Sequence, residues 1–158
     1  MATTFRLLHR DDRPAILEIL RATRAFSPPD VQVAVELVDC YLKDGRDSGY
    51  HFHIAIEDDC LAGYICYGPT PLTKGTWDVY WIVTTPHLKG HGIGSQLLRL
   101  AEENVKAEGG RMLLIETSSS PLYLEARRFY LNRGYVIVSS IPDFYAPGDN
   151  KITFRKVL

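Results

Sequence analysis

A strongly β-prone run passes into a glycine-rich turn and then into a helix near the middle of this 158-residue chain. Residues 76–84 are rich in Trp, Tyr, Val and Ile, and the turn carries Gly90, Gly92 and Gly94. Alternate glycines let successive backbone amides face one ligand, and the start of a helix adds its dipole. The segment therefore predicts a phosphate or pyrophosphate site. A purely structural tight turn is the alternative, and it would need only one glycine.

Composition limits what kind of protein surrounds this turn. The chain is 46% hydrophobic and 23% charged, close to the globular average, and 158 residues suffice for one ordinary domain. We expect one domain over 1–158. The net charge is -1, so bulk attraction to nucleic acid or to an anionic membrane is not expected. The longest apolar runs fall well short of the ~18 residues that a membrane span needs.

Three cysteines, Cys40, Cys60 and Cys66, lack paired spacing. They predict neither a disulfide framework nor a zinc site, and they favour a reducing, cytoplasmic setting. His51 and His53 would share one face of a strand, where two histidines can bind a metal ion. The sequence offers no evident third ligand, so we expect no metal site and a solvated or partner-facing strand.

Local signals predict an alternation of strands and helices. The first helix begins near Asp11, and Ser27 to Asp30 is a capping-box start for a second helix that Gly45 ends. A later helix is expected over 122–133, with Leu122, Ala126 and Phe129 facing inward and Gly134 as its stop. The expected strands are 5–8, 50–56, 60–67, 76–84, 112–115, 135–141 and 152–157.

This order predicts a mixed α/β sheet, antiparallel in its first half and with a βαβ unit in the middle. The near-continuous apolar run 112–115 is typical of a strand covered on both faces. Residues 143–149 are expected to form a turn-rich hairpin loop near the chain end.

Two anion-binding families use a glycine turn of this kind. In the dinucleotide fingerprint, Gly90 and Gly92 fit and Glu116 could bind a ribose, but the third glycine position is Ser95. The turn also begins five residues after Thr84, whereas a dinucleotide turn follows its strand directly, and there are too few βα units for a full dinucleotide domain.

The second family fits better. Residues 89–94 resemble the acetyl-coenzyme A signature of the GNAT superfamily of N-acetyltransferases, Gln/Arg-x-x-Gly-x-Gly/Ala, with Lys89 in place of the usual Gln or Arg. Residues 126–135 resemble the second signature of that family, about 40 residues further on. The family often has an Asn three residues before the Ala of that signature, where this chain has Tyr123. The two motifs jointly indicate the family, and either alone would be weak.

The resemblance implies acetyl transfer from acetyl-CoA to a primary amine through a tetrahedral intermediate, on a GNAT-like sheet with a splayed strand pair. It implies that Tyr130 is the acid near the sulfur, with Glu116 as the first and Asp78 as the second candidate base, or else a bare water chain. The implied coenzyme-binding residues are Ile82, Val83, Thr84, Lys89, Gly90, His91, Gly92, Ile93, Gly94 and Ser95.

Three points stay open at this level. The amine acceptor has no motif that identifies it, so small amines, amino acids and protein amines are all candidates, and a homodimer is possible. A coenzyme A-binding sensor or partner module without catalysis is the second hypothesis, against which the presence of Tyr130 and Glu116 argues. A dinucleotide-binding protein is the third.

Overall fold

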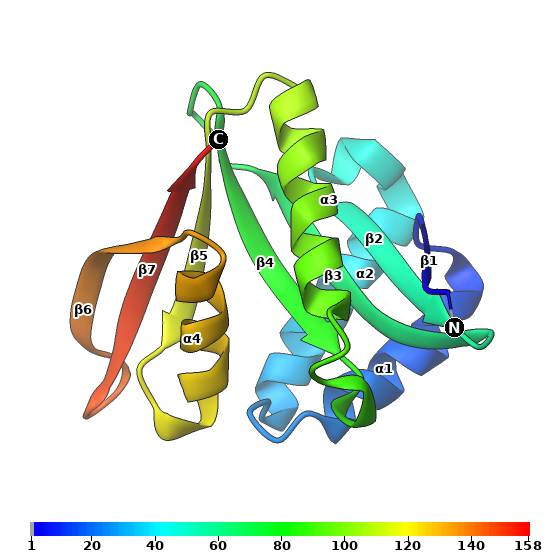
Figure 1. The fold of residues 1–158 in the computed structure, drawn as a ribbon, viewed down its shortest axis with the longest axis horizontal. Helices are drawn as coiled ribbons and strands as arrows, with labels where there is room; N and C mark the ends of the chain where they lie inside the picture. The colour runs from blue at the N-terminus through cyan, green and yellow to red at the C-terminus, as the bar shows by residue number, and fades with distance from the viewer. Residues whose placement is uncertain (1) are drawn as a thin grey trace.

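Seven strands form one mixed sheet in the computed structural model, which describes residues 2–158 (Figure 1). The sheet order is β1-β2-β3-β4-β5-β7-β6. The strands are β1 (Thr4–Arg6), β2 (His51–Glu57), β3 (Cys60–Pro69), β4 (Thr76–Thr84), β5 (Met112–Ser118), β6 (Val136–Ala146) and β7 (Asp149–Val157). The helices are α1 (Arg13–Ala22), α2 (Pro28–Asp44), α3 (Ile93–Ala107) and α4 (Leu124–Asn132).

The predicted helix boundaries correspond to real caps. At the start of α2, the Asp30 carboxylate accepts a hydrogen bond from the Ser27 amide at 2.8 Å, and Ser27 Oγ accepts one from the Asp30 amide at 3.3 Å. This is the reciprocal pair of a capping box. Gly45 follows α2 with a positive φ of 58°, as expected of a residue that ends a helix. The expected start and stop of α2 are therefore confirmed.

The parallel contact of β4 with β5 is flanked by antiparallel pairs. The hairpin between β2 and β3 turns at Asp58 and Asp59, both with positive φ near 55°, which short carboxylate side chains tolerate. The parallel pair encloses α3 as its crossover helix. The predicted antiparallel half and central βαβ unit are thus both present.

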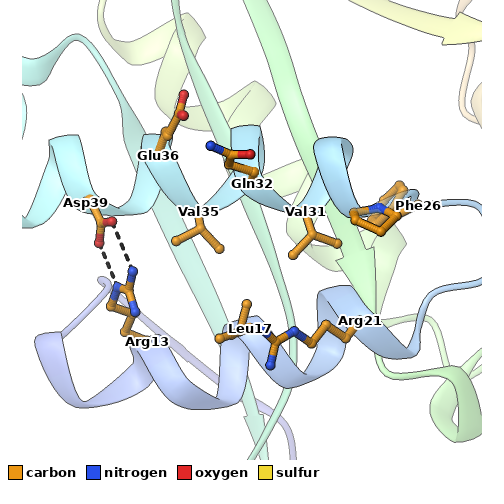
Figure 2. A pocket seen from close by; sticks show the side chains of 10 residues that line it. Arg13, Leu17, Arg21, Phe26, Val31, Gln32, Val35, Glu36 and Asp39 are labelled. Carbon is orange, nitrogen blue, oxygen red and sulfur yellow. Dashed lines mark hydrogen bonds and ion pairs between the residues drawn. The ribbon is translucent and has the colours of Figure 1, made fainter.

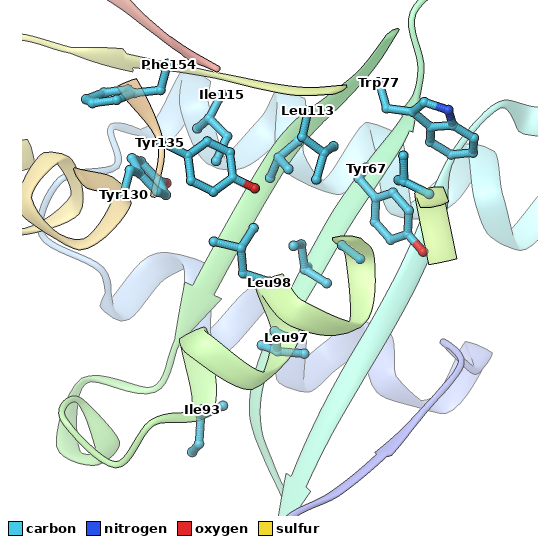
Figure 3. Packing of buried hydrophobic residues seen from close by; sticks show 14 of the residues in the cluster. Tyr67, Trp77, Ile93, Leu97, Leu98, Leu113, Ile115, Tyr130, Tyr135 and Phe154 are labelled. Atoms are coloured by element: carbon cyan, nitrogen blue, oxygen red, sulfur yellow. The ribbon is translucent and has the colours of Figure 1, made fainter. Parts of the chain in front are cut away.

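Helices cover the sheet on two faces and create two separate cores. On one face α1 and α2 pack against β2, β3 and β4, around side chains such as Ile16, Val38 and Tyr64. On the other face α3 and α4 pack over β2, β3, β4, β5 and β7 (Figure 3). This second core contains Leu97, Leu113 and an aromatic group of Tyr130, Tyr135 and Phe154.

Several expectations were wrong in detail. β5 is not covered on both faces: Leu113 and Ile115 are buried, whereas Leu114 and Glu116 point to a face that no helix fully covers. Leu122 does not face inward but is exposed. It lies in a 3₁₀ turn, Pro121–Tyr123, that precedes α4 and directs the Leu122 side chain away from the core.

The late loop is also shorter than expected. β6 continues to Ala146 and pairs there with Asp149, so most of residues 143–149 is strand rather than loop. The excess residues are absorbed by an irregularity between Ile141 and Ala146, where Asp143 has a φ of 58°. A bulged strand of this kind retains turn-forming residues such as Pro142 and Asp143, which is why the sequence pattern resembles a loop.

Candidate active site

Strands β4 and β5 separate partway along their length and leave an opening in the sheet. They pair only from Thr76–Val79 to Met112–Ile115. The β3–β4 register shifts at the same level, because Cys66 pairs with Trp81 and Tyr67 with Val79, which leaves Tyr80 as an extra residue on β4. A bulge increases local bending and twist. Figure 1 shows the two strands parting from there toward the ends that carry the glycine turn and α4.

Backbone groups of β4 line the opening. The amide of Thr85 donates to the carbonyl of Ala62 at 2.8 Å, so that residue faces β3. Backbone groups alternate in direction along an antiparallel strand. The amides of Ile82 and Thr84 therefore face away from β3, toward the space that β5 has left. Donors fixed in this position can hold a carbonyl oxygen.

The glycine turn presents further amides at the start of α3. Gly90 and Gly92 have positive φ values of 86° and 80°, and a Cβ atom at either position would meet nothing within 4 Å. The first α3 hydrogen bond is made by the amide of Gln96 to the carbonyl of Gly92. Among the described residues, the amides of Ile93, Gly94 and Ser95 precede that bond and have no helical partner. Free amides, a helix dipole and open space together fit a pyrophosphate.

The other expected coenzyme residues divide into backbone and side-chain roles. The side chains of Val83 and Ile93 are buried in the two cores. The backbone amide of Ile93 is free to face a ligand, whereas the backbone groups of Val83 face β3. Ser95 Oγ accepts a hydrogen bond from Arg133 Nε at 2.6 Å. Lys89 Nζ lies 3.6 Å from a Glu125 carboxylate oxygen on α4. His91 is exposed in the turn and has no resolved role.

Tyr130 lies in the second core, on the α3–α4 face of the sheet. Its ring packs at centroid distances of 5.5 Å from Phe154, 5.7 Å from Phe129 and 6.3 Å from Tyr135. The hydroxyl of Tyr130 makes no hydrogen bond to the described residues. Among those residues, Tyr64 has the one side-chain oxygen that is both fully buried and without a partner, so the Tyr130 oxygen is not fully buried. The Tyr130 hydroxyl therefore reaches solvent. Burial raises its pKa, so the phenol is protonated at neutral pH.

Asp78 lies on the opposite face of the sheet. It pairs in register with Leu114, whereas its neighbours Trp77 and Val79 point into the second core. Thr70 Oγ1 donates a hydrogen bond of 2.6 Å to the Asp78 carboxylate. Burial raises the pKa of Asp78, and the negative charge of Glu116 raises it further. A half-buried carboxylate with a raised pKa has the properties of a general base.

Glu116 shares this face with Asp78 but is not desolvated. It is two residues beyond Leu114 on β5, and its side chain is 49% exposed. Its carboxylate lies 3.3 Å from Lys151 Nζ on β7. A carboxylate at the end of a largely buried strand could be desolvated, but this exposed one is not. Glu116 follows Ile115, the last residue of β5 that pairs with β4.

Aromatic and cationic side chains border the same face of the opening. Lys151 is largely covered and its ammonium lies 4.3 Å from the centroid of Phe144. Burial raises the pKa of Tyr145, and the negative charges of Glu116, Asp149 and Asp30 raise it further. Lys151 was missed by sequence reasoning. Only the β5–β7 register, which pairs Ser118 with Lys151, reveals its position.

Tyr123, which replaces a common family asparagine, ties this border to the first helical layer. Its hydroxyl donates a 3.2 Å hydrogen bond to the carbonyl of Ala25, 98 residues away in the chain. The residue thus links the start of α4 to the α1–α2 connection. Burial raises the pKa of Tyr123 to about 12, so the hydroxyl keeps its proton.

A groove lies elsewhere, between α1 and α2 (Figure 2). Its volume is about 540 Å³, and Leu17, Val31 and Val35 form its apolar floor. Arg13 and Asp39 join the two helices beside it with a 2.7 Å ion pair. None of the predicted catalytic or coenzyme residues lines this groove. The predicted site residues therefore lie away from this groove.

Metal-binding groups and membrane-spanning helices are both absent from residues 2–158. No group of three or more His, Cys, Asp or Glu side chains that could hold a metal ion occurs there. His51 and His53 do share a strand face, as expected, but His53 Nε2 is 2.9 Å from the Tyr67 hydroxyl and both rings stack on Tyr67. Within the same range, no helix has the length and apolar character needed to cross a membrane.

Comparison with known proteins agrees with this geometry. Residues 13–135 match the model of the acetyltransferase (GNAT) family. Over 139 residues the chain is 33% identical to the aminoalkylphosphonate N-acetyltransferase of Salmonella typhimurium strain LT2, covering 80% of this chain and 89% of that protein.

Solved structures show the same similarity. A protein from Desulfovibrio desulfuricans that is assigned to the GNAT family of acetyltransferases is 42% identical, with a TM-score of 0.95 over 99% of both chains. The PaiA N-acetyltransferase of Thermoplasma acidophilum, solved in complex with coenzyme A, has a TM-score of 0.78 over both whole chains at 18% identity, which is a likeness of fold.

Proposed function

Because the chain belongs to the acetyltransferase (GNAT) family and is an acetyl-CoA-dependent N-acetyltransferase, we propose that its catalytic centre is the opening between β4 and β5. The observation that carries this proposal is the divergence of the two strands after Val79 and Ile115. We infer that acetyl transfer takes place at this gap, with the free amides of β4, the protonated Tyr130 and the half-buried Asp78 as the groups that serve it. The family uses acetyl-CoA, which supplies the acetyl group as a thioester.

The amides of α3 bind the coenzyme phosphates in this proposal. Ile93, Gly94 and Ser95 offer three donors without helical partners. Gly90 and Gly92 have no side chain that could cover them, and both have the positive φ that favours glycine. The amides of Ile82 and Thr84 then lie further along β4 toward the gap. They would hold the coenzyme arm and the acetyl carbonyl oxygen, whose negative charge increases during the reaction.

Acid and base act from opposite faces of the sheet. Asp78 accepts the proton of the attacking amine on the face of Leu114, supported by its raised pKa and its hydrogen bond from Thr70. Tyr130 donates a proton to the departing sulfur on the α3–α4 face, supported by its protonated state and its unpaired hydroxyl. The gap connects the two faces, so neither group blocks the other.

Asp78 is the better supported base of the two acidic candidates. Glu116 is exposed and engaged by Lys151 at 3.3 Å, whereas Asp78 is half-buried. We assign Glu116 a role in attracting the cationic amine and in raising the pKa of Asp78. Both functions require its charge but not proton transfer.

For the acceptor we propose a small amine that also carries an anionic group, such as an aminoalkylphosphonate. The relative from Salmonella typhimurium bears that substrate class in its name. In this chain, Lys151 offers a largely covered ammonium on the same face as Asp78 and Glu116. Two carboxylates for the ammonium end and one lysine for the anionic end suit a zwitterion.

The roles of the two acids are separable by substitution. Acetyl transfer to an aminoalkylphosphonate is followed by free thiol release, and coenzyme affinity is measured by calorimetry. Asp78→Asn should lower kcat by roughly 10²-fold, the usual span for one acid–base group. The loss should shrink as pH rises, because more amine is then already neutral. Glu116→Gln should mainly raise the KM for the amine.

A matched control is Glu103→Gln, which removes an exposed carboxylate from α3. It should leave both constants unchanged. If Glu116→Gln shows the pH-dependent loss of kcat and Asp78→Asn does not, the base is Glu116.

We also propose a reducing, cytoplasmic setting for the enzyme. The three cysteines are free, with Cys40 and Cys60 exposed and Cys66 buried. Exposed free thiols are typical of compartments that keep them reduced.

A further inference from the structure

Three consecutive serines, Ser118, Ser119 and Ser120, lead the chain from the end of β5 toward α4. We call these three residues the serine turn. The backbone carbonyl oxygens of Ser118 and Ser120 each accept a 2.8 Å hydrogen bond from Nη1 of Arg127, a half-buried residue of α4. A single nitrogen atom on α4 therefore holds both ends of the serine turn.

The serine turn is also fixed to β7. The Ser119 amide donates to the carbonyl of Asn150 at 2.9 Å, and the Asn150 amide donates to Ser119 Oγ at 2.8 Å. The Ser118 hydroxyl forms a hydrogen bond with the Asp149 carboxylate, and the ladder between β5 and β7 reaches Ser118. The serine turn is thus anchored to the sheet without Arg127, and what Arg127 adds is the connection to α4.

Few other polar contacts hold α4 in place. Among the described residues, Arg127 makes the only side-chain hydrogen bonds of this helix. Its one ion pair, between Glu125 and Lys89 at 3.6 Å, joins two exposed side chains, and such pairs contribute little. The rest of its attachment is the apolar contact of Ala126, Phe129 and Tyr130 with the second core. Apolar contacts are non-directional and do not by themselves fix the exact placement of a helix.

We propose that Arg127 is a positioning residue that sets where α4 places Tyr130 relative to the gap between β4 and β5. This inference rests on the role proposed above for Tyr130 as the acid. The two residues are three positions apart, so they are neighbours on the surface of α4. Arg127 fixes that surface to the end of β5, which forms one side of the gap. A misplacement of about 1 Å can lower a rate by ~10²-fold, so loss of this connection should lower kcat.

The bonding pattern predicts which substitution keeps the function. Both hydrogen bonds come from Nη1, and a lysine ammonium is likewise one nitrogen atom with several donors. Arg127→Lys should therefore keep most of the wild-type kcat. Arg127→Met has no donor and should lower kcat by about 10-fold or more. The matched control is Arg128→Met, because Arg128 is exposed and makes no hydrogen bond or ion pair to the described residues, and it should leave kcat unchanged.

The test is a double-mutant cycle with Tyr130→Phe, measured as kcat for the same amine from thiol release. Because Arg127 acts through Tyr130, Arg127→Met should change the kcat of the Tyr130→Phe chain by less than about twofold. The KM for the amine and the calorimetric dissociation constant of acetyl-CoA should stay within about twofold of wild type in Arg127→Met. A merely structural role would lower kcat equally in both backgrounds, and that result would overturn the proposal.

A second measurement needs no turnover. Hydrogen exchange of the α4 amides should be faster in Arg127→Met than in the wild type and should return to normal in Arg127→Lys. Unchanged exchange in Arg127→Met would overturn the proposal. If Arg127→Met does not fold, Arg127→Gln takes its place, because its side chain is too short to reach both carbonyl oxygens.

The remaining outcomes separate this inference from the proposed function. A slow Tyr130→Phe together with a near-normal Arg127→Met would overturn only the role of Arg127. A near-normal Tyr130→Phe would overturn the acid role of Tyr130 and this inference with it. A loss of acetyl-CoA affinity of about 10-fold or more in Arg127→Met would also overturn the inference, because Arg127 would then contact the coenzyme directly.

Discussion

Removing one oxygen atom from Tyr130 separates catalysis from packing. The Tyr130→Phe variant keeps a ring whose neighbours Phe154 and Phe129 lie at centroid distances of 5.5 and 5.7 Å. The lost hydroxyl makes no hydrogen bond to the described residues. Nothing in the core is therefore left unpaired, and the free energy of unfolding should change by less than about 0.5 kcal/mol.

The expected effect on the rate is much larger. Burial raises the pKa of Tyr130, so the hydroxyl carries its proton at neutral pH and can donate it to sulfur. Loss of one acid–base group lowers kcat by roughly 10²-fold or more. A 10²-fold loss corresponds to about 2.7 kcal/mol of transition-state stabilisation. Coenzyme affinity should stay within about twofold of the wild type, because the phosphate amides belong to α3.

Tyr135 supplies the matched control in the same aromatic group. Its hydroxyl donates a 2.8 Å hydrogen bond to a Glu102 carboxylate oxygen. Tyr135→Phe removes that charge-assisted bond and should lower the free energy of unfolding by about 1.5 kcal/mol or more. It should leave kcat unchanged. Thiol release gives kcat, calorimetry gives coenzyme affinity, and urea unfolding gives stability for both variants.

The two variants should therefore show opposite patterns. Tyr130→Phe loses rate and keeps stability, whereas Tyr135→Phe loses stability and keeps rate. A Tyr130→Phe variant with near-normal kcat on a confirmed amine acceptor would refute the assignment. Tyr130 would then be a packing residue only, and the departing sulfur would take its proton from water.

Three further outcomes follow from the same geometry. Acetyl-CoA at about 100 times its dissociation constant should stabilise the wild type by about 2.7 kcal/mol in thermal unfolding. Gly92→Val should lose most of that stabilisation. The control Gly109→Val should keep it, because Gly109 has the same φ near 80° and equal free space but lies at the other end of α3. Burial raises the pKa of Asp78, so the folded chain binds the proton of this carboxyl more tightly than the unfolded chain does, and the free energy of unfolding falls as pH rises from 3.8 through the folded pKa. Asp78→Asn should therefore raise Tm at pH 7 but not near pH 3. An equal rise at both pH values would contradict this. The buried Tyr64 hydroxyl has no partner among the described residues, so Tyr64→Phe should keep or raise stability, by up to about 1 kcal/mol in urea unfolding, and a clear loss would reveal an unrecognised bond.

Local signals predicted the parts of the fold that depend on neighbouring residues. The Ser27–Asp30 cap, the helical stop at Gly134 and the turn before α3 involve groups a few positions apart, and all three are present. The order of strands and helices followed from changes of hydrophobic period. The two motifs that resemble the GNAT family then indicated the splayed sheet.

Features that depend on distant segments could not be predicted in this way. The bulge at Tyr80 exists only relative to β3, and the exposure of Glu116 depends on which sheet face the helices leave open. Lys151 lies in the candidate site because of the register between β7 and β5. A one-residue slip in that register would turn its side chain to the other face of the sheet. The exposed length of β6 was obscured because Pro142 and Asp143 resemble loop residues.

The acceptor assay tests the central claim most directly. Purified chain, acetyl-CoA and an aminoalkylphosphonate should release free thiol and N-acetylated product in equal amounts. The same alkylamine without its phosphonate should be a poorer acceptor by kcat/KM, and Lys151→Met should reduce that preference. Equal kcat/KM for the two amines would contradict the proposed acceptor class. No thiol release above hydrolysis with either of them, or with amino acids and peptide amines, would contradict the proposed catalytic centre.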